Sequence, residues 1–146
     1  MTGKFNETKK ALIEAMELAV PEATISGNWR QTIGHLVENL PFVTVRLQHL
    51  PLEDVYDRNI GEASDGSIAT YRFSAHVFHS NCMEDGEEKG KYAQDVADRI
   101  ESYLIKNVPV GYDIFGVGVR ESGGDSAGSR ISRVVVEGSI NVLRVD

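Results

Sequence analysis

At 146 residues, with 41% hydrophobic and 25% charged residues, the chain has the length and composition of one globular domain, and we expect a single domain over residues 1–146. Fifteen lysines and arginines against 22 aspartates and glutamates give a net charge of −7, which disfavours sequence-independent binding to a phosphate backbone. No apolar run in the sequence approaches the roughly 20 residues of a membrane-spanning helix, so we expect no membrane-embedded role.

The cysteine content and the first residues bear on the compartment of synthesis. Cys82 is the single cysteine of the chain and therefore cannot form an internal disulfide. Met1 is not followed by the apolar stretch of a signal peptide. Both features predict synthesis in a reducing, intracellular environment.

The N-terminal segment has a helical pattern. From Asn6 to Val20, apolar residues recur at three- and four-residue spacing opposite charged ones, which predicts an amphipathic helix. Pro21 ends this helix, and the residues Ser26–Asn28 predict a break in regular structure. Between Trp29 and Pro41 the apolar spacing permits a short helical turn, which Gly34 disfavours.

Two segments in the middle of the chain alternate apolar and polar residues. Phe42–His49 has the period of two that is typical of a half-buried strand, and Ile68–Ser80 repeats it over a longer stretch. Leu52–Ser67, between them, is polar and rich in turn-forming residues, and we interpret it as a long loop. Strands joined in this way favour an antiparallel pair.

The C-terminal part repeats the change from helix to strand. After an acidic break at Glu84–Glu88, apolar residues at helical spacing predict a second amphipathic helix, which ends before Pro109; they are Tyr92, Val96, Ile100, Tyr103 and Leu104. Ile114–Val119 predicts a third strand, and Glu121–Ser129 a flexible hairpin-type loop. A last strand follows at Ile131–Val145, in which Gly138 predicts a bulge or bend.

The order of elements is helix, strand, strand, helix, strand, strand. It predicts an α+β domain in which a mixed, mainly antiparallel sheet of about four strands packs against two main helices. Hairpins connect most neighbouring strands in this interpretation, which excludes a doubly wound parallel sheet.

Several short motifs suggest chemistry, but their contexts favour structural explanations. Gly124–Gly128 looks like the segment around the serine of trypsin-like proteases, yet turn composition alone accounts for it. His76, His79 and Cys82 are metal-ligand types spaced by threes, but an offset of three on a strand places the two histidines on opposite faces. Gly116 and Gly118 lack the third glycine of a dinucleotide fingerprint and favour close backbone approach or bending. We therefore expect no enzyme activity, no metal site and no cofactor.

The chain resembles the tail terminator and tail completion proteins of long-tailed phages and related viruses. The resemblance covers nearly the full length. It rests on the amphipathic N-terminal helix and on four sequences that follow it along the chain: PFVTV at 41–45, YRFSAHVF at 71–78, KYAQDVADRI at 91–100 and VVVEGSI at 134–140. It is a likeness of pattern and element order, without a chemical signature.

The resemblance implies a structural virion protein, made in the host cytoplasm, that acts at the head-proximal end of the tail. Such proteins form a homo-oligomeric ring, commonly a hexamer, that contacts the major tail tube protein and a head-completion or neck protein. The genome passes through this ring without specific binding. The polar loops supply the expected subunit and partner contacts: Asp54, Asp57, Arg58, Asn59, Asp65, Glu121, Asp125, Ser126 and Arg130.

Two alternatives remain at this point. One is a head-completion or neck connector protein on the portal side of the junction. The other is a small α+β enzyme or ligand-binding domain that uses His76, His79 or Tyr71 in a pocket.

Overall fold

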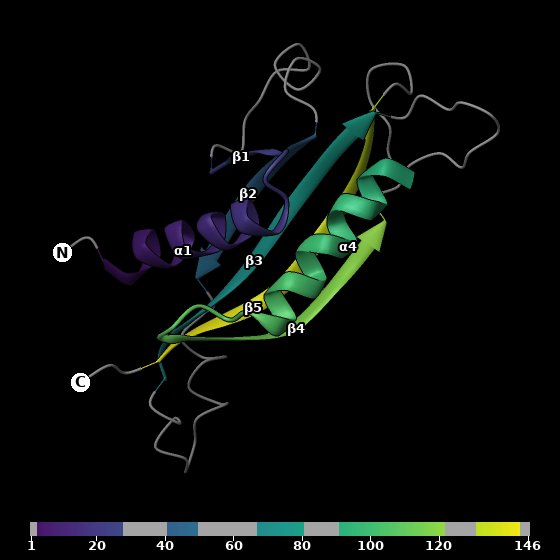
Figure 1. Cartoon of the computed structure of the whole chain (residues 1–146). Coiled ribbons are helices and arrows are strands. Elements are labelled where there is room, and N and C mark those ends of the chain that lie inside the picture. Colours follow the sequence, from purple (N-terminus) through teal and green to yellow (C-terminus); the bar gives the residue numbers. More distant parts are fainter. Residues whose placement is uncertain (1–2, 28–40, 50–66, 81–90, 122–130, 144–146) are drawn as a thin grey trace.

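A computed structural model describes residues 3–27, 41–49, 67–80, 91–121 and 131–143. These residues form two helices and five strands, and the predicted α+β class is confirmed (Figure 1). The helices are α1 (Gly3–Ala19) and α4 (Lys91–Lys106); the strands are β1 (Thr24–Ser26), β2 (Phe42–His49), β3 (Ser67–Ser80), β4 (Tyr112–Glu121) and β5 (Ile131–Leu143).

All five strands belong to one sheet of order β1-β2-β3-β5-β4. The β2–β3, β3–β5 and β5–β4 pairs are antiparallel, whereas β1 lies parallel to β2. The sheet is thus mixed and mainly antiparallel, as predicted, with five strands instead of about four. Long β5 occupies the position between β3 and β4, so α4 connects two strands that are not neighbours.

The additional strand is β1, which lies in a segment whose end we interpreted as a break. Thr24, Ile25 and Ser26 pair with Phe42, Val43 and Thr44, and the Thr24 amide donates a hydrogen bond of 2.9 Å to the Pro41 carbonyl. Three residues are too few to display a period of two. The partner that makes them a strand lies beyond residue 40, so local sequence could not reveal it.

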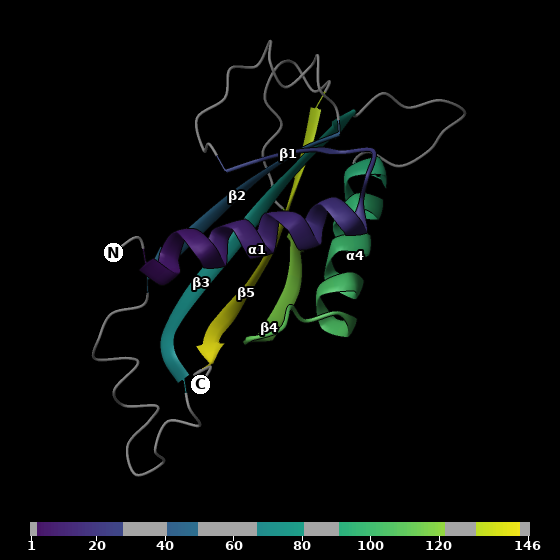
Figure 2. The same cartoon turned by 60° about the vertical axis from the view of Figure 1, so that its left-hand side comes forward.

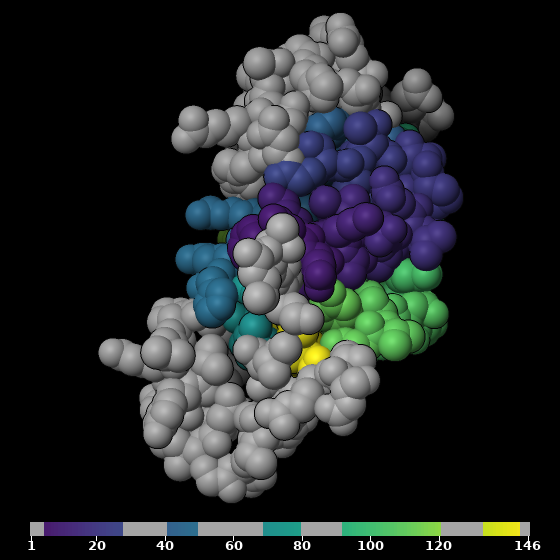
Figure 3. Space-filling view, turned by 90° about the vertical axis from the view of Figure 1, so that its left-hand side faces the viewer, coloured from purple at the N-terminus to yellow at the C-terminus, as the bar shows by residue number. Residues whose placement is uncertain are grey.

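Both helices cover the same face of the sheet. α1 packs on β1 and β2 and crosses the strands obliquely, whereas α4 runs along β3, β5 and β4 (Figure 2). The space-filling view places purple α1 at the surface, with green atoms of the α4–β4 region beside it (Figure 3). The molecule therefore has a helical side and, behind it, a second sheet face that neither helix covers.

The hydrophobic core lies between the helices and the sheet. Alternate strand residues and one stripe of each helix supply it, because side chains of a strand point to opposite faces in turn. Its fully buried members include Leu12, Met16, Val43, Val45, Phe73, Val77, Ile100, Leu104 and Ile140. The helical stripes and the buried positions predicted for β2 and β3 are confirmed.

The irregularity near Gly138 lies in the opposite strand. The register between β4 and β5 shifts between Phe115 and Gly118, and Gly116 there has a φ of 66°, a left-handed value that glycine adopts without strain. Gly138 itself pairs with Phe73, and a Cβ at this position would lie 2.8 Å from Phe73 Cζ. Gly138 is the β5 residue opposite this shift, because Ser139 pairs with Phe115 and Glu137 with Gly118, so the bulge predicted at Gly138 lies at this level of the sheet with its extra residue in β4. The glycine also makes room for the ring of Phe73.

Several predicted boundaries also shift. α1 begins at Gly3 instead of Asn6 and β3 includes Ser67, whereas the residues after Leu143, to which we extended the last strand, lie outside the described residues. Glu121 belongs to β4, because it pairs with Val134, and not to the loop that we predicted to begin there. The helical turn predicted before Pro41, most of the long loop and the glycine-rich loop after Glu121 lie outside the described residues.

Candidate functional site

The residues predicted to contact partners lie almost entirely outside the described part of the chain. Glu121 is the exception, and its backbone closes β4 at the end where β5 begins. Asp54, Asp57, Arg58, Asn59, Asp65, Asp125, Ser126 and Arg130 fall in the ranges 50–66 and 122–130, which the structure does not describe.

The histidines and the tyrosine that suggested a pocket do not converge. His79 lies on the helical side, where its ring centroid is 5.6 Å from that of Tyr92, whereas His76 lies on the opposite sheet face among arginines. Tyr71 is on the helical side but eight residues from His79, or about 26 Å along an extended strand. Cys82 lies outside the described residues. Among those that the structure describes, no group of three or more His, Cys, Asp and Glu residues is placed to hold a metal ion.

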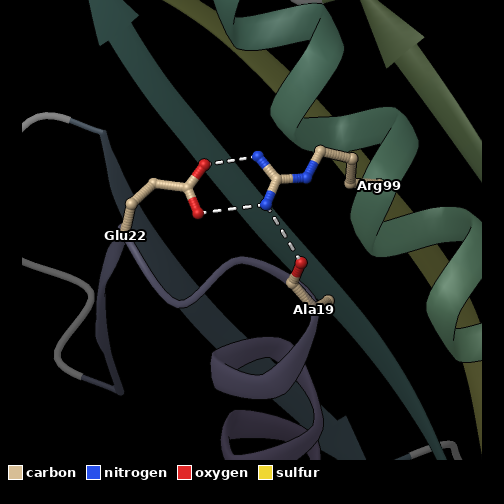
Figure 4. Close-up of polar contacts among 3 residues, drawn as sticks. All are labelled: Ala19, Glu22 and Arg99. Atoms are coloured by element: carbon tan, nitrogen blue, oxygen red, sulfur yellow. Dashed lines mark hydrogen bonds and ion pairs between the residues drawn. The ribbon is translucent and has the colours of Figure 1, made fainter.

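An ion pair joins the turn after α1 to the middle of α4. The Arg99 guanidinium of α4 donates from Nη1 and Nη2 to the two carboxylate oxygens of Glu22, and the Nη2–Oε1 distance is 3.0 Å (Figure 4). Nη2 also donates to the carbonyl of Ala19 at 3.4 Å, at the C-terminal end of α1, where a cation is favourable. The hydrogen bond from Arg99 holds the pKa of Glu22 below its usual value.

This contact is structural in character. About half of each side chain is exposed, at 46% and 48%, so solvent screens the pair and its contribution to stability is of order 1 kcal/mol or less. The pair nevertheless connects the turn after α1 to the middle of α4. The pair therefore orients α1 and α4 on the sheet.

The sheet face behind the helices carries a second group of charged residues. We call Arg46, Arg72, Arg120 and Arg133 the arginine face. Arg46 is diagonal to Arg72 across the β2–β3 pair, because its direct partner is Ser74. Arg120 is diagonal to Arg133 across the β4–β5 pair, because its direct partner is Val135. The register thus gathers the arginines of four strands on one surface.

The same face also holds two carboxylates. Arg120 Nε donates to Glu137 Oε1 at 3.1 Å in an exposed ion pair, and Asp113 lies near the far end of β4. The four arginines nevertheless outnumber these acids in the described part of the face.

His76 lies at the centre of the arginine face. It pairs with Thr44 on one side and with Val135 on the other, and Val135 in turn pairs with Arg120. Burial of the imidazole lowers the pKa of His76 to about 4, and the nearby charges of Arg133, Arg120 and Arg46 act in the same direction against the opposing effect of Glu137. A protonated His76 would add a cation where arginines already concentrate positive charge. The face therefore holds His76 neutral.

α4 carries a row of three acids, beside the exposed cations Arg99 and Lys106. Asp95, Asp98 and Glu101 follow one another at three-residue spacing, so they rise along one side of the helix; we call them the acidic stripe. Gln94 donates to Asp98 Oδ1 at 2.9 Å and orients that carboxylate. Asp98 also borders an open depression of about 400 Å³ where α4 meets the end of α1. The acidic stripe and the arginine face thus lie on opposite sides of the molecule.

The sequence pattern indicated which strand positions are polar, but not that the arginines of four strands lie on one surface. Arg46 and Arg72 fall on the polar side of two alternating patterns, which was visible in the sequence. That β5 lies between β3 and β4, and brings Arg133 and Arg120 to the same surface, follows from non-local strand pairing.

Comparisons with known proteins add no family assignment. No model of a known protein family matches the chain, and no curated protein matches it significantly. Within the described residues, neither helix has the length and apolar character required to cross a bilayer.

Proposed function

We propose that this chain is a structural virion protein, a tail terminator that forms a ring on the head-proximal end of the tail tube. The ring stops tube growth and joins the tail to a head-completion or neck protein. The observation that carries the proposal is the element order. The four sequences behind the resemblance belong to β2, β3, α4 and β5, which with α1 form one sheet and one helical layer.

The distribution of side chains supports an assembling role over a catalytic one. Tyr71, His76 and His79 are the chemical groups that a small enzyme would use, and they occupy different faces or ends of the sheet. The charged residues instead form extended surfaces, the arginine face and the acidic stripe. Extended and chemically different surfaces on opposite sides of a subunit are what a heterologous ring contact requires.

The partners follow from the role. A hexameric ring of this chain would contact the major tail tube protein on one rim and the neck protein on the other. The overall charge of −7 suits a ring through which the genome passes without adhering, because like charge disfavours contact with phosphates.

The test uses purified full-length chain and tail tubes from the virus that encodes it, assembled without this protein. We expect rings at one end of each tube by electron microscopy, and tubes that no longer elongate when tube subunits are added. Tubes that continue to grow and carry no added density at either end would contradict the proposal.

Loss of the gene separates termination from joining. Abnormally long tails indicate that termination has been lost, as we expect. Free tails of normal length beside filled heads would instead assign the chain to the head-completion or neck connector role.

A further inference from the structure

The two charged surfaces of this chain are complementary and lie on opposite sides of the molecule. We infer that the arginine face of one copy docks on the acidic stripe of the next copy. This inference rests on the proposed ring function and identifies the interface that would build the ring.

Chemistry favours this pairing. Arginine presents a planar fork of donors that binds a carboxylate with two parallel hydrogen bonds, so it is the preferred cation for interfaces between charged side chains. Every lysine or arginine within the described strands lies on the arginine face, and all four are arginines. The acidic stripe offers three carboxylates along about 9 Å of helix axis, since α4 rises 1.5 Å per residue.

The shapes are also compatible. The sheet face is broad, and α4 lies on the other side of the sheet together with α1 (Figures 1 and 2). The open depression of about 400 Å³ beside Asp98 can admit the end of an arginine side chain. Asp98 is the carboxylate at this depression, which Arg99 and Lys106 also border; the Arg99 guanidinium is already bound to Glu22.

The placement of the surfaces determines the symmetry. A contact between two different surfaces is heterologous, and the pair of copies retains one unused surface of each kind. Addition of further copies therefore continues until rotation between neighbours closes a ring. A two-fold dimer, in which the same surface faces itself, would bring arginines against arginines.

Charge exchange tests the interface directly. One variant carries Arg46→Glu and Arg72→Glu, and a second carries Asp95→Lys and Asp98→Lys; all four side chains are exposed. We expect each variant alone to self-associate about 10- to 100-fold more weakly than the wild-type chain, because like charges then face each other. An equimolar mixture should recover assembly, since each variant supplies the surface that the other lacks. Sedimentation velocity at low and at high salt measures all three samples.

A matched control changes the same amount of charge elsewhere. Glu14→Lys with Glu17→Lys alters two exposed residues of α1 and should leave self-association close to that of the wild-type chain. Circular dichroism establishes that each variant is folded; for any that is not, Arg46→Gln with Arg72→Gln or Asp95→Asn with Asp98→Asn gives the same test with smaller effects.

The outcomes that overturn the interface are distinct from failure of the proposed function. Rings that form equally well in both exchanged variants would refute the interface and leave ring function intact. Binding of a short DNA duplex that Arg46→Glu with Arg72→Glu abolishes, without effect on assembly, would assign the arginine face to nucleic acid instead.

Discussion

The two faces of the sheet come from the same strands and differ in nearly every property. The helical face consists of residues such as Val45, Phe73 and Ile140, which are buried under α1 and α4. The residues between them in sequence form the arginine face and its surroundings, with exposed Arg46 and Gln48 and partly buried His76. Burial of apolar surface stabilises the first face, whereas the second carries the arginines together with buried Phe42 and Val135.

The two faces therefore contribute differently to the stability of the fold and to contacts with other molecules. Substitutions on the helical face change the free energy of unfolding, because the side chains there have no contact with water. Exposed charges on the arginine face contribute little to folding. Gly138 on the helical face and His76 on the arginine face test these two contributions separately.

Phe73→Ala should produce the largest effect. The ring is fully buried against the helical layer and over Gly138, so its removal leaves a cavity. We expect a loss of about 3–5 kcal/mol in the free energy of unfolding, measured by urea denaturation. Gln48→Ala on the exposed side of β2 is the control and should change stability by less than about 0.5 kcal/mol. Equal losses in the two variants would contradict the distinction between the faces.

Gly138→Ala should have the next largest effect. The added methyl group would lie 2.8 Å from Phe73 Cζ and 3.1 Å from Val117 Cγ2, so both neighbours must move. We expect a loss of about 1–3 kcal/mol, which is typical of overpacking, by the same denaturation measurement.

Gly118→Ala is the matched control for this contact. Gly118 belongs to the neighbouring strand, and a Cβ there would meet no atom within 4 Å. Because alanine has less backbone freedom in the unfolded chain, this variant should be as stable as the wild type or about 0.4–1 kcal/mol more stable. A stable Gly138→Ala variant would show that Phe73 relaxes without cost.

Local sequence was sufficient for most of the fold because its elements repeat strong periods. The helical stripe through Val96 and Ile100 and the alternation through Val43 and Val45 both survive in the structure. β1 escaped prediction because three residues carry no period and their partner is distant. A bulge at the level of Gly138 was predictable because glycine in a strand often marks one, whereas the extra residue in β4 and the contact with Phe73 depend on the neighbouring strands.

The candidate surfaces were less predictable than the fold. Alternation assigned Arg46 and Arg72 to the polar side of their strands, but the order β3-β5-β4 brings Arg133 and Arg120 beside His76. Strand order results from pairing between residues tens of positions apart, which a local pattern does not encode. The acidic stripe was visible as polar positions of the second helix, without its relation to the arginines.

His76 should give the smallest effect, and it reports on the electrostatics of the arginine face. Its pKa of about 4 in the folded chain lies below the ordinary value of 6.5, so the unfolded chain takes up this proton first as the pH falls. The free energy of unfolding should therefore decrease from about pH 7.5 downward and level off below the folded pKa. His76→Gln should remove about 1 kcal/mol of the decrease between pH 7.5 and 5.5, measured by urea denaturation at several pH values.

Other groups set the background for this measurement. Burial also lowers the pKa of His79, so the His76→Gln variant should retain part of the slope, while Glu22, whose pKa is lowered by Arg99, acts mainly below pH 5. Thr44→Val, at the cross-strand partner of His76, is the control: it alters the same face without adding or removing a titrating group, and its curve should run parallel to that of the wild type. If His76→Gln also runs parallel, the imidazole is protonated as readily in the folded chain as in the unfolded one, and neither its burial nor the arginines around it hold it neutral.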